Sequence, residues 1–418
     1  MCTLNDPSNT NTNTNTNTNT NNICSNSNTV ICPSIAENAG KITGRIIESI
    51  INDSNLFTHE TLDHVAKLDP NDIQIGRLLG RGGFNFVRQV TSSSNYNDDD
   101  DDDDVECQQQ QQYVMKYLNF DKVKRGKRFA RGSADLAIEA YFLASIRHPN
   151  IIQLFGMTEG SIVANVSKGT EECFFLILEE VKYTLRTKLL EWQYEEKNKG
   201  YNFFSRQGRK KRTVMFQTRL QTIQQLTSAI AYLHSKSIVY RDIKPDNIGF
   251  DTKGVLKLFD FGLAKELKLK HQLCDGTYKL TGSTGSCRYM APEVALFKPY
   301  NLSADIFSLG ILSWEILSLQ KPFETFDNLQ YKEFVVRDGL RPKIDKKGKH
   351  SHWPKELQSM LINSWNNDFT QRPTCADIQK TITNITTIAT RSTTNTTATT
   401  NIRFSRYRRI LSAPIDQS

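Results

Sequence analysis

The stretch Val239-Tyr-Arg-Asp242-Ile-Lys-Pro-Asp-Asn247 decides the fold, and it follows a helical pattern that ends at His234. Eighteen residues after Asp242 comes Asp260-Phe-Gly262, and Ala291-Pro-Glu293 follows further along the chain. One aspartate in such a stretch would be an ordinary turn residue. Polar residues in this order and at these spacings do not arise by chance, so together they mark a site that carries chemistry.

A second motif, Gly80-Arg-Gly82-Gly83-Phe-Asn-Phe-Val87, follows a strand-like run. A glycine-rich turn lets backbone N–H groups approach phosphate oxygens, because no Cβ atoms stand in the way. Taken alone, the motif also fits a plain hairpin turn. A dinucleotide fingerprint is disfavoured because a strand follows, and a Walker loop is excluded because no Gly-Lys-Ser/Thr ends the turn.

A third feature pairs a lysine with a carboxylate. Tyr113-Val-Met-Lys116 is an apolar run that ends in a lysine, and Glu139 lies on the apolar face of the helical pattern over 134–147. A carboxylate that faces a core needs a cationic partner. Lys116 is therefore the expected partner of Glu139; the alternative is an ordinary lysine at a sheet edge.

Periodicity divides the chain into a strand-rich first half and a helical second half, which predicts an α+β fold in two lobes. Strands are expected at 73–79, 84–90, 113–118, 151–154 and 174–178, and helices at 42–51, 134–147, 185–192, 216–234, 303–318 and 356–365.

With these motifs in order, the chain over roughly Ile73–Ile388 resembles a eukaryotic protein kinase of the Ser/Thr type. Lys244 in Asp-Ile-Lys-Pro-Asp-Asn is typical of Ser/Thr kinases. Trp365, seven residues before Arg372, is similar to the ending of the tyrosine-kinase-like group. The resemblance implies a two-lobed kinase fold, ATP and Mg²⁺ as cofactors, protein substrates, and an upstream activating kinase.

The resemblance also implies roles for single residues. Asp242 would accept the proton of the substrate hydroxyl, Lys244 would lie beside the transferring phosphoryl group, and Lys116 paired with Glu139 would hold the α- and β-phosphates. Asn247 and Asp260 would be the magnesium ligands. Glu293 with Arg372, and Asp305 in the central helix, would be structural. The residues expected to bind ATP are Leu79, Gly80, Gly82, Gly83, Val87, Val114, Lys116, Leu178, Glu179, Val181, Asp246, Asn247 and Asp260.

Three positions depart from the family pattern. Asn85 stands where the third glycine is usual, and Tyr240 replaces the histidine of His-Arg-Asp. Gly249, two residues after Asn247, occupies a position where a bulky apolar side chain normally lies beneath adenine. Restoring a side chain there would either tighten nucleotide binding modestly or over-pack the pocket.

Control is expected in the segment after Asp260. Arg241 and Lys265 would leave two cations close together until a phosphate on the segment neutralised both. The hydroxyls in the right stretch are Thr281, Ser283 and Thr284. Ser286 is excluded as the switch, because the resemblance implies that it contacts Asp242 and Lys244.

The resemblance divides the chain into three parts. Residues 1–72 form an Asn/Thr-rich, mostly disordered lead-in with a helix at 42–51. Residues 73–388 form the kinase domain, with an N-lobe at 73–180, a C-lobe at 181–388 and inserts near 92–112 and 193–215. Residues 389–418 form a Thr/Asn-rich, basic tail.

Composition limits the partners and the compartment. The net charge of +8 is spread over 53 Lys and Arg, so no nucleic acid partner is expected. The eight cysteines include no C-x-x-C pair, which fits neither a disulfide framework nor a metal site. No 18-residue apolar run and no signal-peptide pattern is found, so we expect no membrane association and a cytoplasmic protein, with a nuclear location left open.

Other features leave alternatives open. The basic run at 206–212 is expected to be a solvated loop, with nuclear import or docking as alternatives. The aspartate run at 98–104 is expected to be a flexible loop rather than a metal site. Ser412 follows a basic pair and resembles a phosphorylation site. For the whole chain, a catalytically silent kinase-fold scaffold and a dual-specificity kinase remain alternatives to a Ser/Thr kinase.

Overall fold

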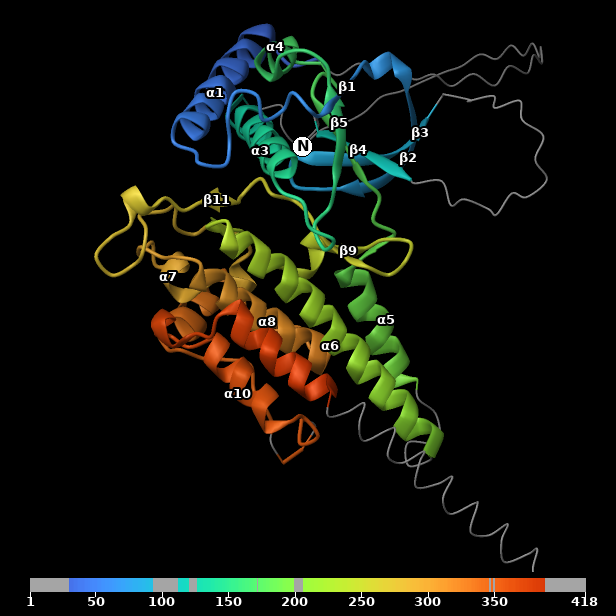
Figure 1. Cartoon of the computed structure of the whole chain (residues 1–418), viewed down its shortest axis with the longest axis vertical. Coiled ribbons are helices and arrows are strands. Elements are labelled where there is room, and N and C mark those ends of the chain that lie inside the picture. The colour runs from blue at the N-terminus through green and yellow to red at the C-terminus, as the bar shows by residue number, and fades with distance from the viewer. Residues whose placement is uncertain are drawn as a thin grey trace, which may run out of the picture.

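A computed structural model describes residues 30–92, 112–119, 126–170, 172–198, 206–345, 347–348 and 350–387. Within these residues the chain forms a small lobe around a sheet and a larger lobe of helices (Figure 1). This arrangement confirms the α+β, two-lobed fold that the sequence predicts.

A six-stranded sheet in the order β1-β5-β6-β4-β3-β2 builds the small lobe. Neighbouring strands are antiparallel, except that β1 runs parallel to β5. The strands are β1 (Ala66–Leu68), β2 (Ile73–Arg81), β3 (Asn85–Ser92), β4 (Tyr113–Leu118), β5 (Leu154–Thr158) and β6 (Phe175–Glu179). The expected N-lobe boundary at residue 73 would leave β1 outside this sheet, so the lobe begins earlier than predicted.

The expected strand at 151–154 was misplaced, because β5 begins where it was predicted to end. Gly156 in mid-strand argues against a strand by propensity. Here a Cβ atom on Gly156 would lie 2.8 Å from the side chain of Leu68 on β1. The glycine therefore permits the close approach of β1, a contact that the local sequence does not reveal.

Three helices pack together in the small lobe: α1 (Pro33–Asn52), α3 (Gly126–Ser145) and α4 (Ile162–Lys168) (Figure 1). The prediction of a helix at 42–51 was too short, and the prediction of a mostly disordered lead-in was wrong for residues 30–72. The first turns of α1 bury Ala36, Ala39 and Gly40 instead of large apolar side chains. Small residues allow close packing against α4 but give little hydrophobic periodicity, which explains the short prediction.

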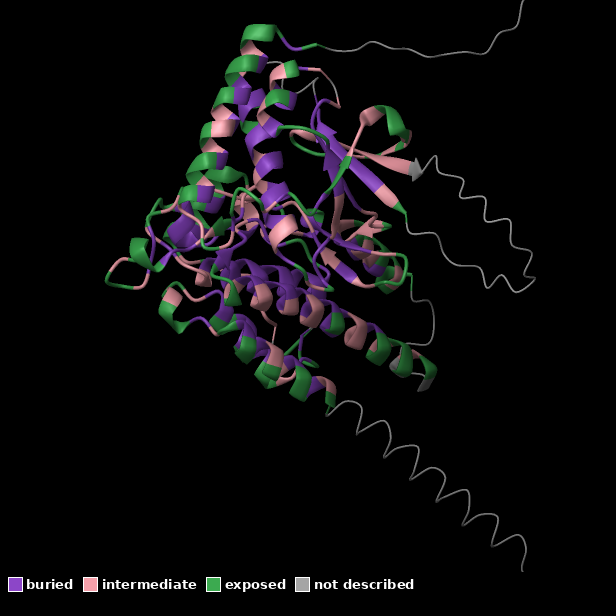
Figure 2. Ribbon diagram, turned by 45° about the horizontal axis from the view of Figure 1, so that its top comes forward, coloured by how far each residue is buried: buried purple, intermediate pink, exposed green. Residues whose placement is uncertain are grey.

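The large lobe is organised around α8 (Ser303–Ser318), in which every residue from Ala304 to Ser318 is buried (Figure 2). A helix that is apolar on all sides belongs in a core. Around it lie α5 (Leu185–Lys197), α6 (Arg206–Ser235), α7 (Pro292–Ala295), α9 (Asn328–Gln330), a π-helical stretch (Tyr331–Arg337), α10 (Lys355–Ser364) and a helix over 375–387.

Short strands form two further sheets in the described part of the chain. They are β7 (Tyr183–Thr184), β9 (Ile248–Phe250) and β10 (Leu256–Leu258) in one sheet, and β8 (Ile238–Val239) with β11 (Lys265–Glu266) in another. All pairs in the two small sheets are antiparallel.

The basic run at 206–212 forms the first turns of α6, so the prediction of a solvated loop there was wrong. Lys, Arg and Gln are good helix formers, and one glycine costs only about 1 kcal/mol. The helix predicted at 216–234 therefore extends back through the basic run. The predicted insert at 193–215 includes the end of α5 and the start of α6, which are separated by residues 198–205.

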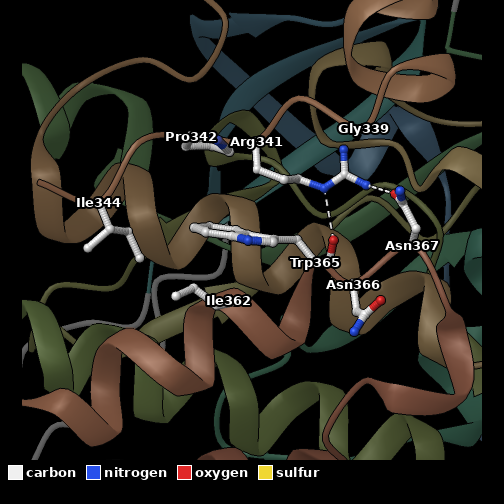
Figure 3. Close-up of a pocket in the computed structure, with 8 residues that line it drawn as sticks. All are labelled: Gly339, Arg341, Pro342, Ile344, Ile362, Trp365, Asn366 and Asn367. Carbon is white, nitrogen blue, oxygen red and sulfur yellow. Dashed lines mark hydrogen bonds between the residues drawn. The ribbon is translucent and has the colours of Figure 1, made fainter.

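Trp365 closes α10 and lies beneath a surface cavity of about 430 Å³ (Figure 3). Arg341 donates from Nε to the Trp365 carbonyl at 2.8 Å, and its guanidinium also bonds Asn367. Burial lowers the pKa of Arg341 to about 10. The arginine thus ties the end of α10 to the chain that follows the π-helical stretch.

Several predicted features lie outside the described residues: the Asn/Thr tracts, the Asp run, all of the Gln run except Gln112, and Ser412. Among the described helices, none has both the length and the hydropathy that crossing a bilayer requires.

Arg372 and Glu293 form a bidentate pair, with N–O distances of 2.6 and 2.9 Å, and the arginine side chain is fully buried. We expect Arg372→Met to lower the free energy of unfolding by about 3–5 kcal/mol, because it leaves a buried carboxylate unpaired. Urea denaturation measures this loss. The double variant Arg372→Met/Glu293→Gln should lose clearly less, and equal losses in both would contradict the account.

Candidate active site

Lys116 on β4 lies at the meeting point of three elements. Its Nζ donates to Glu139 Oε2 on α3 at 2.5 Å and to Asp260 Oδ1, after β10, at 3.1 Å. Lys116 and Glu139 are both buried, whereas 43% of the Asp260 side chain is accessible. The structure therefore brings together the three charged residues that the sequence analysis selected from separate motifs.

The pKa values of this cluster follow from its charges. Burial alone would lower the pKa of Lys116, but the carboxylates of Asp260 and Glu139 outweigh it and raise that pKa. The Lys116 ammonium holds the pKa of Asp260 below its usual value, against the effect of burial. Burial raises the pKa of Glu139, against the opposing effect of the Lys116 charge. Lys116 therefore stays an ammonium and Asp260 a carboxylate at neutral pH.

Backbone geometry and ring packing fix Asp260 in place. Its φ of 69° lies in the left-handed region, which costs a non-glycine residue about 1–3 kcal/mol unless its surroundings hold it there. The next residue, Phe261, is fully buried between the rings of Phe142 at 6.3 Å and Tyr240 at 5.3 Å. These contacts hold the strained turn.

Tyr240, which stands where the family pattern has a histidine, packs against the Asp-Phe-Gly turn. Its ring meets Phe261 edge-on, and its hydroxyl donates to the carbonyl of Phe259. Burial raises the pKa of Tyr240 well above its usual value. The Tyr240 hydroxyl is therefore hydrogen-bonded and neutral. Its bond links the loop after β8 to the chain that follows β10.

Asp242 lies in a second polar network, on the loop after β8. Its carboxylate accepts hydrogen bonds from Lys244 Nζ at 2.6 Å, from Asn247 Nδ2 at 2.9 Å, and from the backbone N–H and hydroxyl of Ser286 at 2.9 and 2.8 Å. Ser286 was expected to contact Asp242 and Lys244; its N–H and its hydroxyl both donate to Asp242, and no hydrogen bond from it to Lys244 is found among the described residues. The Asn247 amide nitrogen is used within the loop, which leaves its oxygen for a ligand.

Asp305 on α8 anchors this loop from below. It accepts from the backbone N–H groups of Tyr240 at 2.8 Å and Arg241 at 2.9 Å, and from His234 at 3.1 Å. Arg241 also has a left-handed φ, of 72°. The buried carboxylate offsets the cost of that turn and places Asp242, the next residue.

The glycine-rich hairpin covers the site from β2 and β3. Gly80 pairs with Val87, and the N–H of Gly82 donates to the carbonyl of Asn85 at 2.7 Å. None of Gly80, Gly82 and Gly83 has a positive φ, and a Cβ on Gly83 would meet no described atom within 4 Å. The glycines here provide space rather than an unusual turn, and Asn85 closes the hairpin without strain.

The other residues expected around adenine lie on β2, β4 and β6 and in the chain that follows β6. Val114 pairs with Leu178 across β4 and β6, and both side chains are buried, while Leu79 on β2 is partly exposed. Glu179 ends β6. In the described part of the chain, no group hydrogen-bonds the backbone of Val181, so its N–H and carbonyl are available.

The side chain of Val181 lies next to Gly249, a contact that the sequence did not predict. A Cβ atom built on it would lie 2.8 Å from Cβ and 3.0 Å from Cγ2 of Val181. The Val181 side chain already fills the space that a side chain at 249 would need. Of the two outcomes the sequence left open, the geometry therefore favours over-packing.

Residues expected to control activity gather near Arg241. Its Nη1 donates to the Thr281 hydroxyl at 3.3 Å and to the Tyr300 hydroxyl at 3.2 Å. Burial and then the charge of Arg241 lower the pKa of Lys265. Thr284 bonds the carbonyl of Thr281 at 3.0 Å, and the N–H of Ser283 donates to Val294.

One network was not foreseen. Arg186 at the start of α5 bonds Asp246 at 2.9 Å and the buried Glu315 of α8 at 3.1 Å, and Glu315 also accepts from the Tyr289 hydroxyl at 2.6 Å. A glutamate within the apolar run of α8 was a signal of a buried pair. Nothing in the local sequence identified Arg186 as its partner.

The fold and the site together define a two-lobed domain with a buried Lys–Glu pair between the lobes and an aspartate-centred loop below it. Residues 103–382 match the model of the protein kinase domain family, and the chain belongs to this family.

Several relatives are named serine/threonine kinases. Serine/threonine-protein kinase STY46 of Arabidopsis thaliana is 40% identical over 160 residues, which cover 38% of this chain and 26% of that protein. STY17 of the same plant is 31% identical over 247 residues, covering 59% and 36%. Mitogen-activated protein kinase kinase kinase 7 of Homo sapiens is 28% identical over 264 residues, covering 59% and 35%. The chain thus spans about a quarter to a third of the length of these relatives.

Gly249→Leu should weaken nucleotide binding, because the new side chain collides with Val181 and over-packing costs about 1–3 kcal/mol. Titration with a fluorescent ATP analogue measures the change in Kd. The double variant Gly249→Leu/Val181→Ala restores the space and should recover most of the affinity. Unchanged or tighter binding by the single variant would show that the two side chains do not compete.

Proposed function

We propose that the chain is a protein serine/threonine kinase that transfers the γ-phosphoryl group of MgATP to hydroxyls of protein substrates in signalling. The observation that carries this proposal is the double contact of Lys116, at 2.5 Å from Glu139 and 3.1 Å from Asp260. Phosphoryl transfer needs positioned positive charge more than covalent chemistry, and protein kinases require this lysine–glutamate pair to be in place.

The donor set of the site suits a magnesium nucleotide. Asp260 offers an accessible carboxylate, and Asn247 has an amide oxygen that its loop does not use. Hard oxygen ligands of this kind hold Mg²⁺, which would supply positive charge against the phosphates. Lys116 would hold the phosphates, the glycine-rich hairpin would cover them, and the free backbone groups of Val181 would hydrogen-bond the adenine.

The polar network around Asp242 suits a reaction at a substrate hydroxyl. Asp242 would orient the incoming hydroxyl and accept its proton, while Lys244, which touches Asp242 at 2.6 Å, would lie beside the transferred phosphoryl group. Ser286 holds one oxygen of Asp242 and leaves the other toward Lys244 and Asn247. The carboxylate is therefore oriented before substrate arrives.

Two observations favour serine and threonine as acceptors. Lys244 lies in the Asp-Ile-Lys-Pro-Asp-Asn run, and two of the relatives matched above, STY46 and STY17, are named serine/threonine kinases. A silent scaffold is the runner-up, and it predicts that nucleotide binds without transfer. A dual-specificity kinase predicts that phosphotyrosine forms as well.

Asp242→Asn should reduce phosphoryl transfer to background while ATP affinity stays within about twofold, because Asp242 acts on the hydroxyl and not on the nucleotide. Lys116→Met should lose both transfer and affinity, since it removes the phosphate contact and unpairs Glu139. Label transfer from γ-labelled ATP to a generic protein substrate, with parallel nucleotide titration, separates the two. Near-normal turnover by Asp242→Asn would show that another group is the base.

Phosphorylation of Thr281, Ser283 or Thr284 should activate the enzyme by neutralising Arg241 and Lys265, since a phosphate forms strong charge-assisted hydrogen bonds. Thr281 is already within 3.3 Å of Arg241. Replacing all three hydroxyls with alanine should cut activity about tenfold or more while the melting temperature stays near that of wild type. Full activity in the triple variant, or in phosphatase-treated enzyme, would show that the segment is ordered without phosphate.

A further inference from the structure

The segment before the first strand of the sheet lies along the helix that carries Glu139. We call residues 33–65 the N-terminal strap; it comprises α1 and the chain that leads to β1. Ile35 packs against the start of α3, where a Cβ on Gly126 would lie 3.1 Å from it. Near the other end of α3, His64 contacts the carbonyl of Ala144 at 3.1 Å. The strap thus spans α3 from its first turn to its last.

Between these ends, an aromatic cluster joins the strap to α3. Phe57 is buried, and its ring lies 5.0 Å from that of Phe142 and 5.8 Å from that of Tyr141, edge-on in both cases. Phe142 in turn contacts Phe261, the residue after Asp260. A single side chain, that of Phe142, therefore lies between Phe57 and Phe261, the residue after Asp260.

The strap encloses α3 on the side away from the sheet. Twelve of the twenty residues of α3 are buried, which leaves this helix little free surface (Figure 2). Glu139 itself is 1% exposed. Because the strap lies on that side, α3 cannot move away from Lys116 unless the strap is displaced as well.

The strap also holds the chain that follows Asp260. Ser54 Oγ donates to Glu266 Oε2 at 2.7 Å, and the N–H of Asn55 donates to Glu266 Oε1 at 3.1 Å. One residue earlier, Asp53 binds Lys270 at 2.6 Å, and this contact holds the pKa of Asp53 down to about 2. Both partners lie within 265–271, directly beyond the Asp-Phe-Gly turn.

We propose that the N-terminal strap is a positioning element of the active site: it holds α3 and residues 265–271 in the arrangement that closes the Lys116–Glu139 pair, without a separate partner protein. The inference rests on the proposed kinase function. Contacts made in one arrangement and lost in another shift the equilibrium toward the first. Among the described contacts of Phe57 and Ser54, none is to a residue proposed to hold the phosphates or the substrate hydroxyl, so the two residues act through α3 and Glu266.

The test compares strap variants of the full chain, per folded molecule, well below their melting temperatures. Phe57→Ala should lower kcat/KM about tenfold, because the competent arrangement becomes a minor fraction of the molecules. Phe57→Leu, which keeps most of the packing, should recover most of that loss. Ser54→Ala removes the donor to Glu266 and the hydroxyl oxygen that accepts from the N–H groups of Leu56 and Phe57, all at a half-buried site, and it should cause a smaller loss than Phe57→Ala.

Hydrogen exchange provides a second readout that does not depend on activity. Phe57→Ala should speed exchange in 126–145, and Ser54→Ala in 263–271, while exchange in 303–318 stays unchanged. Ile385→Ala is the matched control: it also truncates a buried apolar side chain, but in the C-terminal helix. This variant should lower the melting temperature without changing kcat/KM or exchange in α3.

Each outcome of these measurements either supports or overturns the proposal. Wild-type kcat/KM and wild-type exchange in α3 for Phe57→Ala would overturn the proposal and leave the strap as packing alone. Equal activity losses in Phe57→Ala and Ile385→Ala would also overturn it. If wild-type enzyme transfers no phosphate at all, the proposed function fails, and the exchange data alone still decide whether the strap holds α3.

Discussion

The buried ion pair between Lys116 and Glu139 is the constraint on which the rest of the site depends. Glu139 is almost fully enclosed, so removing its partner would leave an unpaired charge in the core. The pair fixes the separation of β4 and α3, and Asp260 joins it from the large lobe at 3.1 Å. The Lys116 ammonium therefore holds β4, α3 and the chain that follows β10 together.

The two lobes reach this arrangement by different means. In the large lobe, Asp305 holds the backbone of the loop before Asp242 from a helix that is buried on all sides. In the small lobe, α3 is held between the sheet and the strap, through contacts such as that of Phe57 with Phe142. Asp305 therefore positions the loop of Asp242 in the large lobe, and the sheet and the strap position α3 in the small lobe. As a result, the two polar networks lie on either side of one site.

The sequence predicted the parts of the fold whose signals are local. The strand at 113–118 and the helix at 303–318 were predicted to the residue, because long apolar runs mark them. The start of α1 was missed because it packs with alanine and glycine. For the site, a carboxylate on an apolar helix face indicated the pair of Lys116 and Glu139, and motif spacing selected Asp260; the structure describes the contacts of Lys116 with both. Arg186 and the fit of Val181 to Gly249 depend on tertiary contacts between distant segments, which no local pattern encodes.

The most direct test of the account is transfer of label from γ-labelled ATP by the purified wild-type chain, with Mg²⁺ and a generic protein substrate, followed by phosphoamino-acid analysis. A preassembled Lys116–Glu139–Asp260 cluster predicts Mg²⁺-dependent label on serine and threonine. Tight nucleotide binding with no transferred label would contradict the central claim and identify a silent scaffold, and label on tyrosine would contradict the assignment to the Ser/Thr type.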